Sequence, residues 1–154
     1  TLYLVNHPNH LGTPLALFIV AVGIGGVVVN YLADAQRQRV RETGGKTTIF
    51  GRPPEIIIGN YVTAEGERRQ SLLLCNGFWG IARHFHYVPE LLGAFCWTVP
   101  ALFNDVLAYF YVIFLTILLT DRALRDDNRC AAKYGADWEL YKKKVPYRIL
   151  PGIF

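Results

Sequence analysis

The first apolar block of the chain, residues 13–32 (TPLALFIVAVGIGGVVVNYL), contains no charged residue. A transmembrane helix needs about 20 apolar residues to cross the hydrocarbon core, so this block predicts a crossing near residues 13–33. A cleaved signal peptide is the alternative, but it would have a basic flank before the apolar run and a small-residue cleavage site after it. Neither is present. The glycines inside this block do not follow a strand as a dinucleotide-binding motif would, and small residues in a membrane helix permit close packing of a neighbouring helix.

The second apolar block, residues 91–120, contains Asp105 as its one charged residue. It is too long for a single crossing, and Pro100 lies inside it. Proline interrupts a helix, so this block predicts two helices, near residues 91–103 and 106–120, joined by a short turn.

Composition supports a membrane protein. Hydrophobic residues make up 52% of the 154 residues, and the mean hydropathy is +0.22, above what a soluble domain of this size usually has. The fold class expected is all-α, as part of a multi-pass integral membrane protein. The sequence begins with Thr and contains no Met, so we expect it to be a piece of a longer protein.

All sixteen Lys and Arg lie at or after Arg37, in two zones that flank the second apolar block. The positive-inside rule places both zones in the cytoplasm, in part of segment 34–90 and in segment 121–154. A net charge of +4 is also seen in nucleic-acid-binding proteins. Basic residues next to membrane helices follow from topology and from attraction to anionic lipid, so the expected contact is membrane lipid and no nucleic acid.

The cysteines and histidines predict no metal site. Cys75, Cys96 and Cys130 form neither a CxxC pair nor a ligand spacing. His84 and His86 are two residues apart, which puts them on different sides of a helix.

Arg37 and Arg41 are four residues apart and therefore share one face of a helix that leaves the membrane. Two cations on one face repel each other unless an anion such as a phosphate lies between them. The alternative, which this segment alone favours, is a helix end whose arginines extend into the water at the membrane surface. Glycines and prolines then break the helix, and residues 56–69 are predicted to be extended or looped.

Residues 121–154 extend the last membrane helix into the cytoplasm. A cation, an anion, a thiol and a phenol recur every four residues and therefore form one stripe along the helix: Arg122, Asp126, Cys130 and Tyr134. A parallel stripe is basic, at Arg125, Arg129 and Lys133. A solvated, salt-bridged helix end would give a similar mixture, but arginines beside aromatic rings suit a ligand with a flat ring and phosphates, such as a nucleotide.

A short helix is expected after this stripe. Gly135 is predicted to end the long helix, and Asp137 is predicted to be the N-cap of the short helix that carries Trp138 and Tyr141.

Several stretches of the sequence resemble a known family. The stretches LLLCNGFWGIARHFHY (72–87) and LLTDRALRDDNRCAAKYGADWELYKKKVPYRILPGIF (118–154), together with LYLVNHP, FGRPP and AYFYVIFLTILLTDR, are similar to the membrane sterol reductases, and within them to the branch that reduces the Δ7 bond. The resemblance implies NADPH as cofactor and a fold of about ten transmembrane helices in the endoplasmic reticulum membrane. Residues 1–154 would be the C-terminal portion of a single reductase domain with a cytoplasm-facing cofactor pocket, and this fragment alone is expected to be inactive.

The resemblance also implies which residues bind the cofactor. The positions that match the family are Arg37, Arg41, Leu74, Trp79, Arg83, His84, His86, Tyr87, Arg122, Asp126, Cys130, Tyr134 and Tyr141. The family usually has Asn at the position of His86, and Gly-Asp where this chain has Pro89 and Glu90.

The implied reaction belongs to sterol biosynthesis, including that of cholesterol. A proton adds to one carbon of the sterol C7=C8 bond, and hydride from the nicotinamide adds to the resulting carbocation. The proton donor is unknown, and the acidic candidates in this chain are Asp126 and Glu90.

Other functions remain open. The Δ14 and Δ24(28) sterol reductases share both signature stretches, and a lamin B receptor-like scaffold would share the membrane domain. An isoprenylcysteine carboxyl methyltransferase-like enzyme would use S-adenosylmethionine, for which Arg37 and Arg41 have no obvious need. The expected partners are a sterol substrate and membrane lipid, and the resemblance also allows association with other sterol biosynthesis enzymes.

Overall fold

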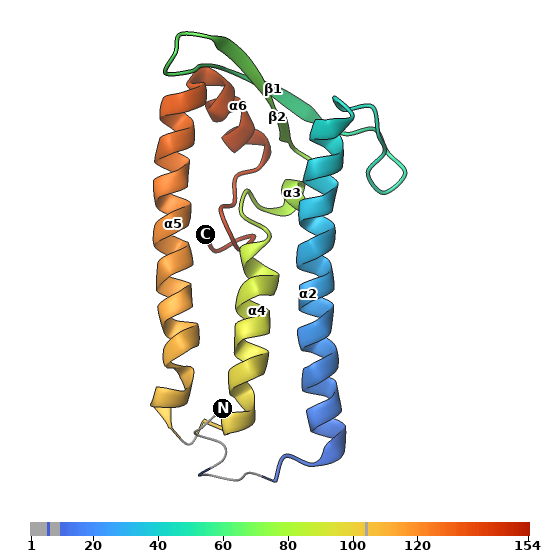
Figure 1. The fold of residues 1–154 in the computed structure, drawn as a ribbon, viewed down its shortest axis with the longest axis vertical. Coiled ribbons are helices and arrows are strands. Elements are labelled where there is room, and N and C mark those ends of the chain that lie inside the picture. Colours follow the sequence, from blue (N-terminus) through green and yellow to red (C-terminus); the bar gives the residue numbers. More distant parts are fainter. Residues whose placement is uncertain (1–5, 7–9, 104) are drawn as a thin grey trace. The chain divides into compact units, whose positions relative to one another are not determined.

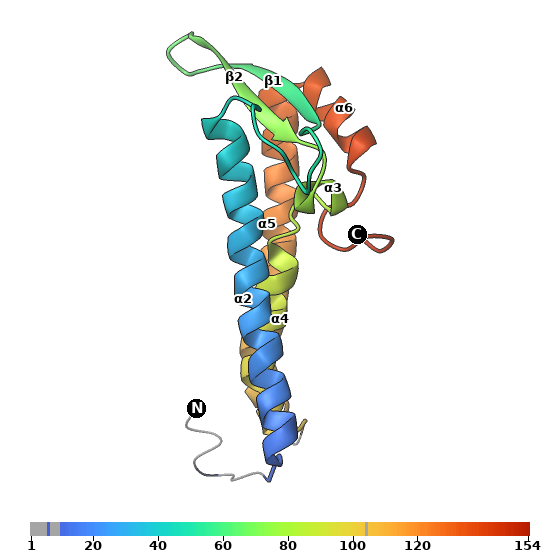
Figure 2. The same cartoon turned by 90° about the vertical axis from the view of Figure 1, so that its right-hand side faces the viewer.

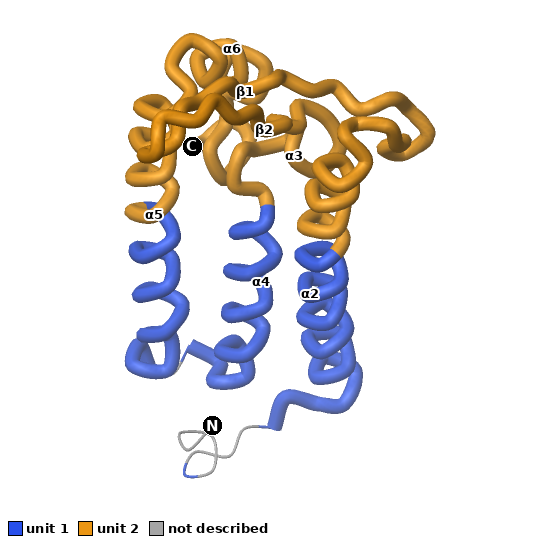
Figure 3. Tube along the Cα trace, turned by 45° about the horizontal axis from the view of Figure 1, so that its top comes forward, with its two compact units in different colours: residues 1–31, 86–120 blue, residues 32–85, 121–154 orange. Residues whose placement is uncertain are grey.

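A computed structural model describes residues 6, 10–103 and 105–154, and the elements follow the chain as drawn in Figure 1. Residues 1–31 and 86–120 form unit 1, and residues 32–85 and 121–154 form unit 2 (Figure 3). Apart from Asn6, the motif LYLVNHP lies outside the described residues.

Among the described residues, two helices have the length and apolar composition to cross a membrane. One is α2 (Thr13–Glu42), and the other runs from Val106 to Tyr134, combining the 3-10 turn η2 (Val106–Tyr109) with α5 (Phe110–Tyr134). The helices predicted near 13–33 and 106–120 are therefore present, and each extends further into the polar sequence.

The helix predicted near residues 91–103 differs from expectation. It is α4 (Tyr87–Thr98), which begins earlier, has 12 residues and is about 18 Å long. The hydrocarbon core is about 30 Å thick, so α4 is too short to cross it. Pro100 lies in a 3-10 turn, η1 (Val99–Ala101), and Leu102 then takes a left-handed φ of 56° that ends the helix.

Glycines of α2 pack closely against α4 within unit 1. A Cβ added to Gly26 would lie 3.2 Å from the carbonyl oxygen of Pro89, and one added to Gly23 would lie 3.4 Å from Cβ of Cys96. Small residues thus let the two helices approach, as the sequence predicted for this block.

Unit 2 contains a sheet that the all-α prediction did not include. Strands β1 (Ile56–Val62) and β2 (Arg68–Leu74) form an antiparallel hairpin, in which Ile56 pairs with Leu74 and Val62 with Arg68. The prediction of an extended segment is confirmed, and the fold is mostly helical rather than all-α.

The hairpin contributes to two hydrophobic clusters because successive strand residues point to opposite faces. Ile57 and Leu73 pack with residues of α6 (Ala136–Lys144), which lies beside β1 in Figure 1 and Figure 2. Ile56, Leu72 and Leu74 pack with a second cluster that includes Trp79. Both faces of the hairpin are therefore used for packing.

Gly135 ends α5, as predicted, with a φ of 52°. The predicted N-cap at Asp137 is wrong: Gly135 occupies the N-cap position, and Asp137 lies in the first turn of α6. The Asp137 carboxylate instead accepts hydrogen bonds from the backbone N–H and the side-chain amide of Asn60 in β1, at 3.0 and 3.2 Å. The aspartate therefore ties the hairpin to α6.

Candidate functional site

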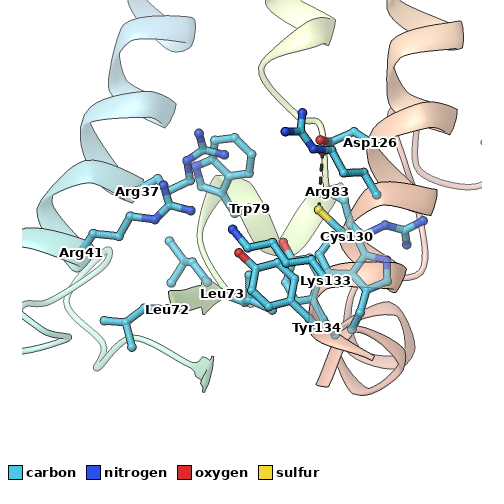
Figure 4. A pocket seen from close by; sticks show the side chains of 14 residues that line it. Arg37, Arg41, Leu72, Leu73, Trp79, Arg83, Asp126, Cys130, Lys133 and Tyr134 are labelled. Carbon is cyan, nitrogen blue, oxygen red and sulfur yellow. Dashed lines mark hydrogen bonds between the residues drawn. The ribbon is translucent and has the colours of Figure 1, made fainter. Parts of the chain in front are cut away.

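Unit 2 contains a cavity of about 360 Å³, which is within the range of small-molecule sites. Its walls come from the end of α2, from β2, from α5 and α6, and from the short helix α3 (Phe78–Ile81) with the loop after it (Figure 4). The lining residues are Arg37, Arg41, Leu72, Leu73, Leu74, Trp79, Arg83, Asp126, Arg129, Cys130, Lys133, Tyr134, Trp138 and Tyr141.

The α2 wall pairs a cation with an aromatic ring. Cζ of Arg37 lies 4.3 Å from the ring centroid of Trp79, within the distance of a cation–π contact. Trp79 is 2% exposed, and its indole N–H donates to the carbonyl oxygen of Ala33 at 2.8 Å. This bond attaches α3 to α2 and fixes the ring below Arg37.

Arg83 is held by the backbone near the C-terminal end of the chain. It is 5% exposed; its Nη1 donates to the carbonyl oxygens of Val145 and Pro146 at 2.7 and 2.9 Å, and its backbone N–H donates to the carbonyl oxygen of Tyr147 at 3.0 Å. Its Nη2 lies 3.2 Å from Oδ2 of Asp127. The arginine expected to bind cofactor is thus strongly engaged within the protein.

Asp127 and Arg148 are residues that the sequence did not single out. Asp127 is 6% exposed, and its Oδ2 also accepts from Nε of Arg148 at 2.9 Å. Asp127 follows Asp126 directly and Arg148 is 21 residues further on, so neither shares the four-residue periodicity that identified the stripe on α5. A buried carboxylate between two arginines is a structural ion-pair network.

His84 lies next to the cavity rather than in its lining. Its backbone N–H donates to the carbonyl oxygen of Arg148 at 2.7 Å, and its Nε2 is 3.9 Å from Oδ2 of Asp126. Burial lowers the pKa of His84 below its ordinary value of 6.5, and this effect outweighs the nearby carboxylates of Asp126 and Asp127, which raise it. The imidazole is therefore neutral at pH 7.

All four residues of the predicted stripe lie in α5, and three of them line the cavity. Asp126, Cys130 and Tyr134 line the cavity, whereas Arg122 does not. Sγ of Cys130 lies 3.9 Å from Oδ2 of Asp126 (Figure 4). The side chain of Asp126 is 45% exposed, so this carboxylate is open to a ligand.

The aromatic residues predicted near Gly135 form the α6 wall. Trp138 and Tyr141 are 4% and 5% exposed, and their ring centroids are 5.0 Å apart. Burial strongly raises the pKa of Tyr141, so its phenol keeps its proton throughout the physiological range.

Most of the predicted site residues therefore meet in one cavity. Four do not line it: His84, His86, Tyr87 and Arg122. His86 and Tyr87 belong to unit 1, as does Glu90, in the first turn of α4. Five further residues line the cavity without having been predicted from the sequence: Leu72, Leu73, Arg129, Lys133 and Trp138. The basic stripe on α5 was the sequence feature that could have identified Arg129 and Lys133 as lining residues.

The cavity is strongly basic. Five of its lining residues are Lys or Arg and one is Asp, an excess of four positive charges. Among the described residues, no group of three or more His, Cys, Asp or Glu is arranged to hold a metal ion. Cations beside aromatic rings can bind a flat, polyanionic ligand.

Comparisons with known proteins cover the whole chain. The family model described as "Ergosterol biosynthesis ERG4/ERG24 family" matches residues 1–154. The chain is 60% identical over 153 residues to 7-dehydrocholesterol reductase of Arabidopsis thaliana and 42% identical over 153 residues to 7-dehydrocholesterol reductase of Xenopus laevis. It is 40% identical over 152 residues to Delta(14)-sterol reductase of Methylotuvimicrobium alcaliphilum. These alignments cover 99% of the chain but 35%, 32% and 34% of those proteins, so the chain spans about a third of their length.

Proposed function

The chain belongs to the ergosterol biosynthesis ERG4/ERG24 family, and we propose that it is part of an NADPH-dependent enzyme that reduces the C7=C8 bond of 7-dehydrosterols. The observation that carries the substrate assignment is the 60% identity to a relative named 7-dehydrocholesterol reductase. We further propose that the protein is a multi-pass protein of the endoplasmic reticulum membrane, which the two candidate membrane-spanning helices support.

The lining of the cavity fits NADPH. Four of its cations form no ion pair with a described residue and complement the phosphates of the cofactor: Arg37, Arg41, Arg129 and Lys133. Tyr134 is half-buried in the lining and offers an aromatic face for one of the cofactor rings, whereas the buried ring of Trp79 supports Arg37. Arg37 and Arg41 lie on one face of α2 and would hold a phosphate that neutralises their mutual repulsion.

NADPH supplies a hydride when it is bound, and the residues of this chain bind and orient it. Asp126 presents an exposed carboxylate that can accept a hydrogen bond from an amide or a ribose hydroxyl. The guanidinium group of Arg83 donates its hydrogen bonds to Val145, Pro146 and Asp127. Its contribution is therefore to stabilise the wall of the cavity.

A Δ14-sterol reductase is the second candidate. The 40% identity to a relative of that name supports it. Both candidates use the same cofactor site and differ in the position of the sterol double bond.

Sterol profiling tests the proposal. The full-length protein that contains these residues is expressed in cells lacking Δ7 reduction, beside an Arg37→Ala/Arg41→Ala variant and an Arg125→Ala control. Arg125 pairs with Asp121 at the surface and does not line the cavity. We expect 7-dehydrosterols to disappear with the wild type and the control and to persist with the double variant. Loss of Δ14 intermediates alone would support the second candidate, and an unchanged sterol profile would contradict both.

A further inference from the structure

Strand β1 contacts the cavity wall at three consecutive residues. A Cβ added to Gly59 would lie 2.8 Å from Cδ1 of Tyr134, so the strand backbone lies directly against that ring. Asn60 is hydrogen-bonded to Asp137 of α6. These two contacts fix the hairpin over the junction of α5 and α6.

The third contact orients a cation. Nζ of Lys133 lies 3.8 Å from the ring centroid of Tyr61 and 5.1 Å from that of Tyr134, and the two rings meet edge to face at 5.7 Å. Figure 4 shows Lys133 and Tyr134 together at the cavity. A lysine side chain has many rotamers, and two rings that attract its ammonium group restrict them.

Lys133 keeps its charge available. It lines the cavity, and among the described residues it forms no ion pair. An aromatic face attracts an ammonium group without neutralising it, unlike a carboxylate. The ammonium group can therefore pair with an anion.

We propose that Lys133 binds a phosphate of the nucleotide cofactor and that Tyr61 of the hairpin is a positioning residue that acts through Lys133. The proposal rests on the proposed function, because it takes the ligand of the cavity to be NADPH. It gives the hairpin a part in cofactor binding. If the phosphate contacted is the 2′-phosphate, which NADH lacks, the hairpin also contributes to selectivity for NADPH; if it is the diphosphate, which both cofactors carry, it does not.

The test measures the affinity of the full-length protein for NADPH and for NADH. The variants are Lys133→Met, Tyr61→Leu and their combination, with Lys143→Met as the matched control. Lys143 is an exposed cation of α6 outside the cavity lining. We expect Lys133→Met to weaken NADPH binding roughly 10-fold and Tyr61→Leu roughly 3-fold. The combined variant should bind NADPH no more weakly than Lys133→Met alone, because Tyr61 acts through Lys133.

The outcomes separate the possibilities. A loss confined to NADPH assigns Lys133 to the 2′-phosphate, and an equal loss with NADH assigns it to the diphosphate. If wild-type protein binds NADPH and Lys133→Met binds it equally well, this inference fails and the proposed function stands. If the losses of NADPH affinity caused by Lys133→Met and Tyr61→Leu add fully in the combined variant, Tyr61 does not act through Lys133. If wild-type protein binds neither cofactor, the proposed function fails, and the inference with it.

Discussion

The buried ion pairs of Asp127 predict a large loss of stability when the carboxylate is removed. Asp127→Asn keeps the shape of the side chain and one carbonyl acceptor but leaves the charge of Arg83 buried without a carboxylate. Breaking a buried pair by removing one partner costs about 3–5 kcal/mol. We expect the lower end, about 3 kcal/mol, because Asn can still accept a hydrogen bond and the side chain of Arg148 is 36% exposed.

Asp121 on the same helix is the matched control. It also pairs with an arginine, Arg125, but both side chains are more than half exposed, and exposed pairs contribute about 0–1 kcal/mol. The assay is thermal unfolding of the full-length protein in detergent, followed as the fraction that stays monodisperse after heating. We expect Asp127→Asn to lower the midpoint by several degrees more than Asp121→Asn. Equal shifts would refute the argument that burial makes the Asp127 pairs strong.

Three further changes test other parts of unit 2. Trp79→Phe keeps the ring but removes the 2.8 Å bond to Ala33; NADPH affinity should fall a few-fold, and unchanged affinity would contradict the role of Trp79. Gly59→Ala places a Cβ 2.8 Å from the Tyr134 ring, so it should weaken NADPH binding through displacement of that ring, and wild-type affinity would contradict the close packing. Burial lowers the pKa of His84 below 6.5, so as the pH falls below this value the unfolded chain gains a proton that the folded chain does not, and stability decreases. His84→Gln should flatten the dependence of melting temperature on pH in this range, and an equally steep dependence would contradict this.

The apolar pattern predicted the long helices because a charge-free run of this length has few other stable arrangements. It predicted the helix near residues 91–103 less well. Residues 91–103 are 13 residues long, fewer than the about 20 that a crossing helix needs. Pro100 and the left-handed Leu102 end the helix earlier still, and the backbone conformation of Leu102 has no signature in the sequence. Helix periodicity also brought Asp126, Cys130 and Tyr134 to one wall of the cavity, because residues four apart share a face.

The hairpin was the main structural feature that the sequence showed only as an extended segment. A strand with one buried face alternates apolar and polar residues, but this hairpin packs on both faces, so IIIGNYV and RRQSLLL contain unbroken apolar runs. Its contacts with Tyr134 and Asp137 join residues that are far apart in the sequence. No local pattern reports such contacts, which is why Tyr61 had no predicted role.

The arginines of the cavity divide into two groups that their sequence positions do not distinguish. Arg83 is paired with Asp127, whereas Arg37, Arg41 and Arg129 form no ion pair with a described residue. Removing an arginine of either group should weaken cofactor binding, but by different routes. Loss of Arg83 removes support from the wall, so stability falls together with affinity. Loss of Arg37 removes an unpaired charge from the lining of the cavity, so affinity should fall while stability is largely retained. Measuring both quantities for both variants therefore separates the residues that would hold a phosphate from the residue that holds the cavity in shape.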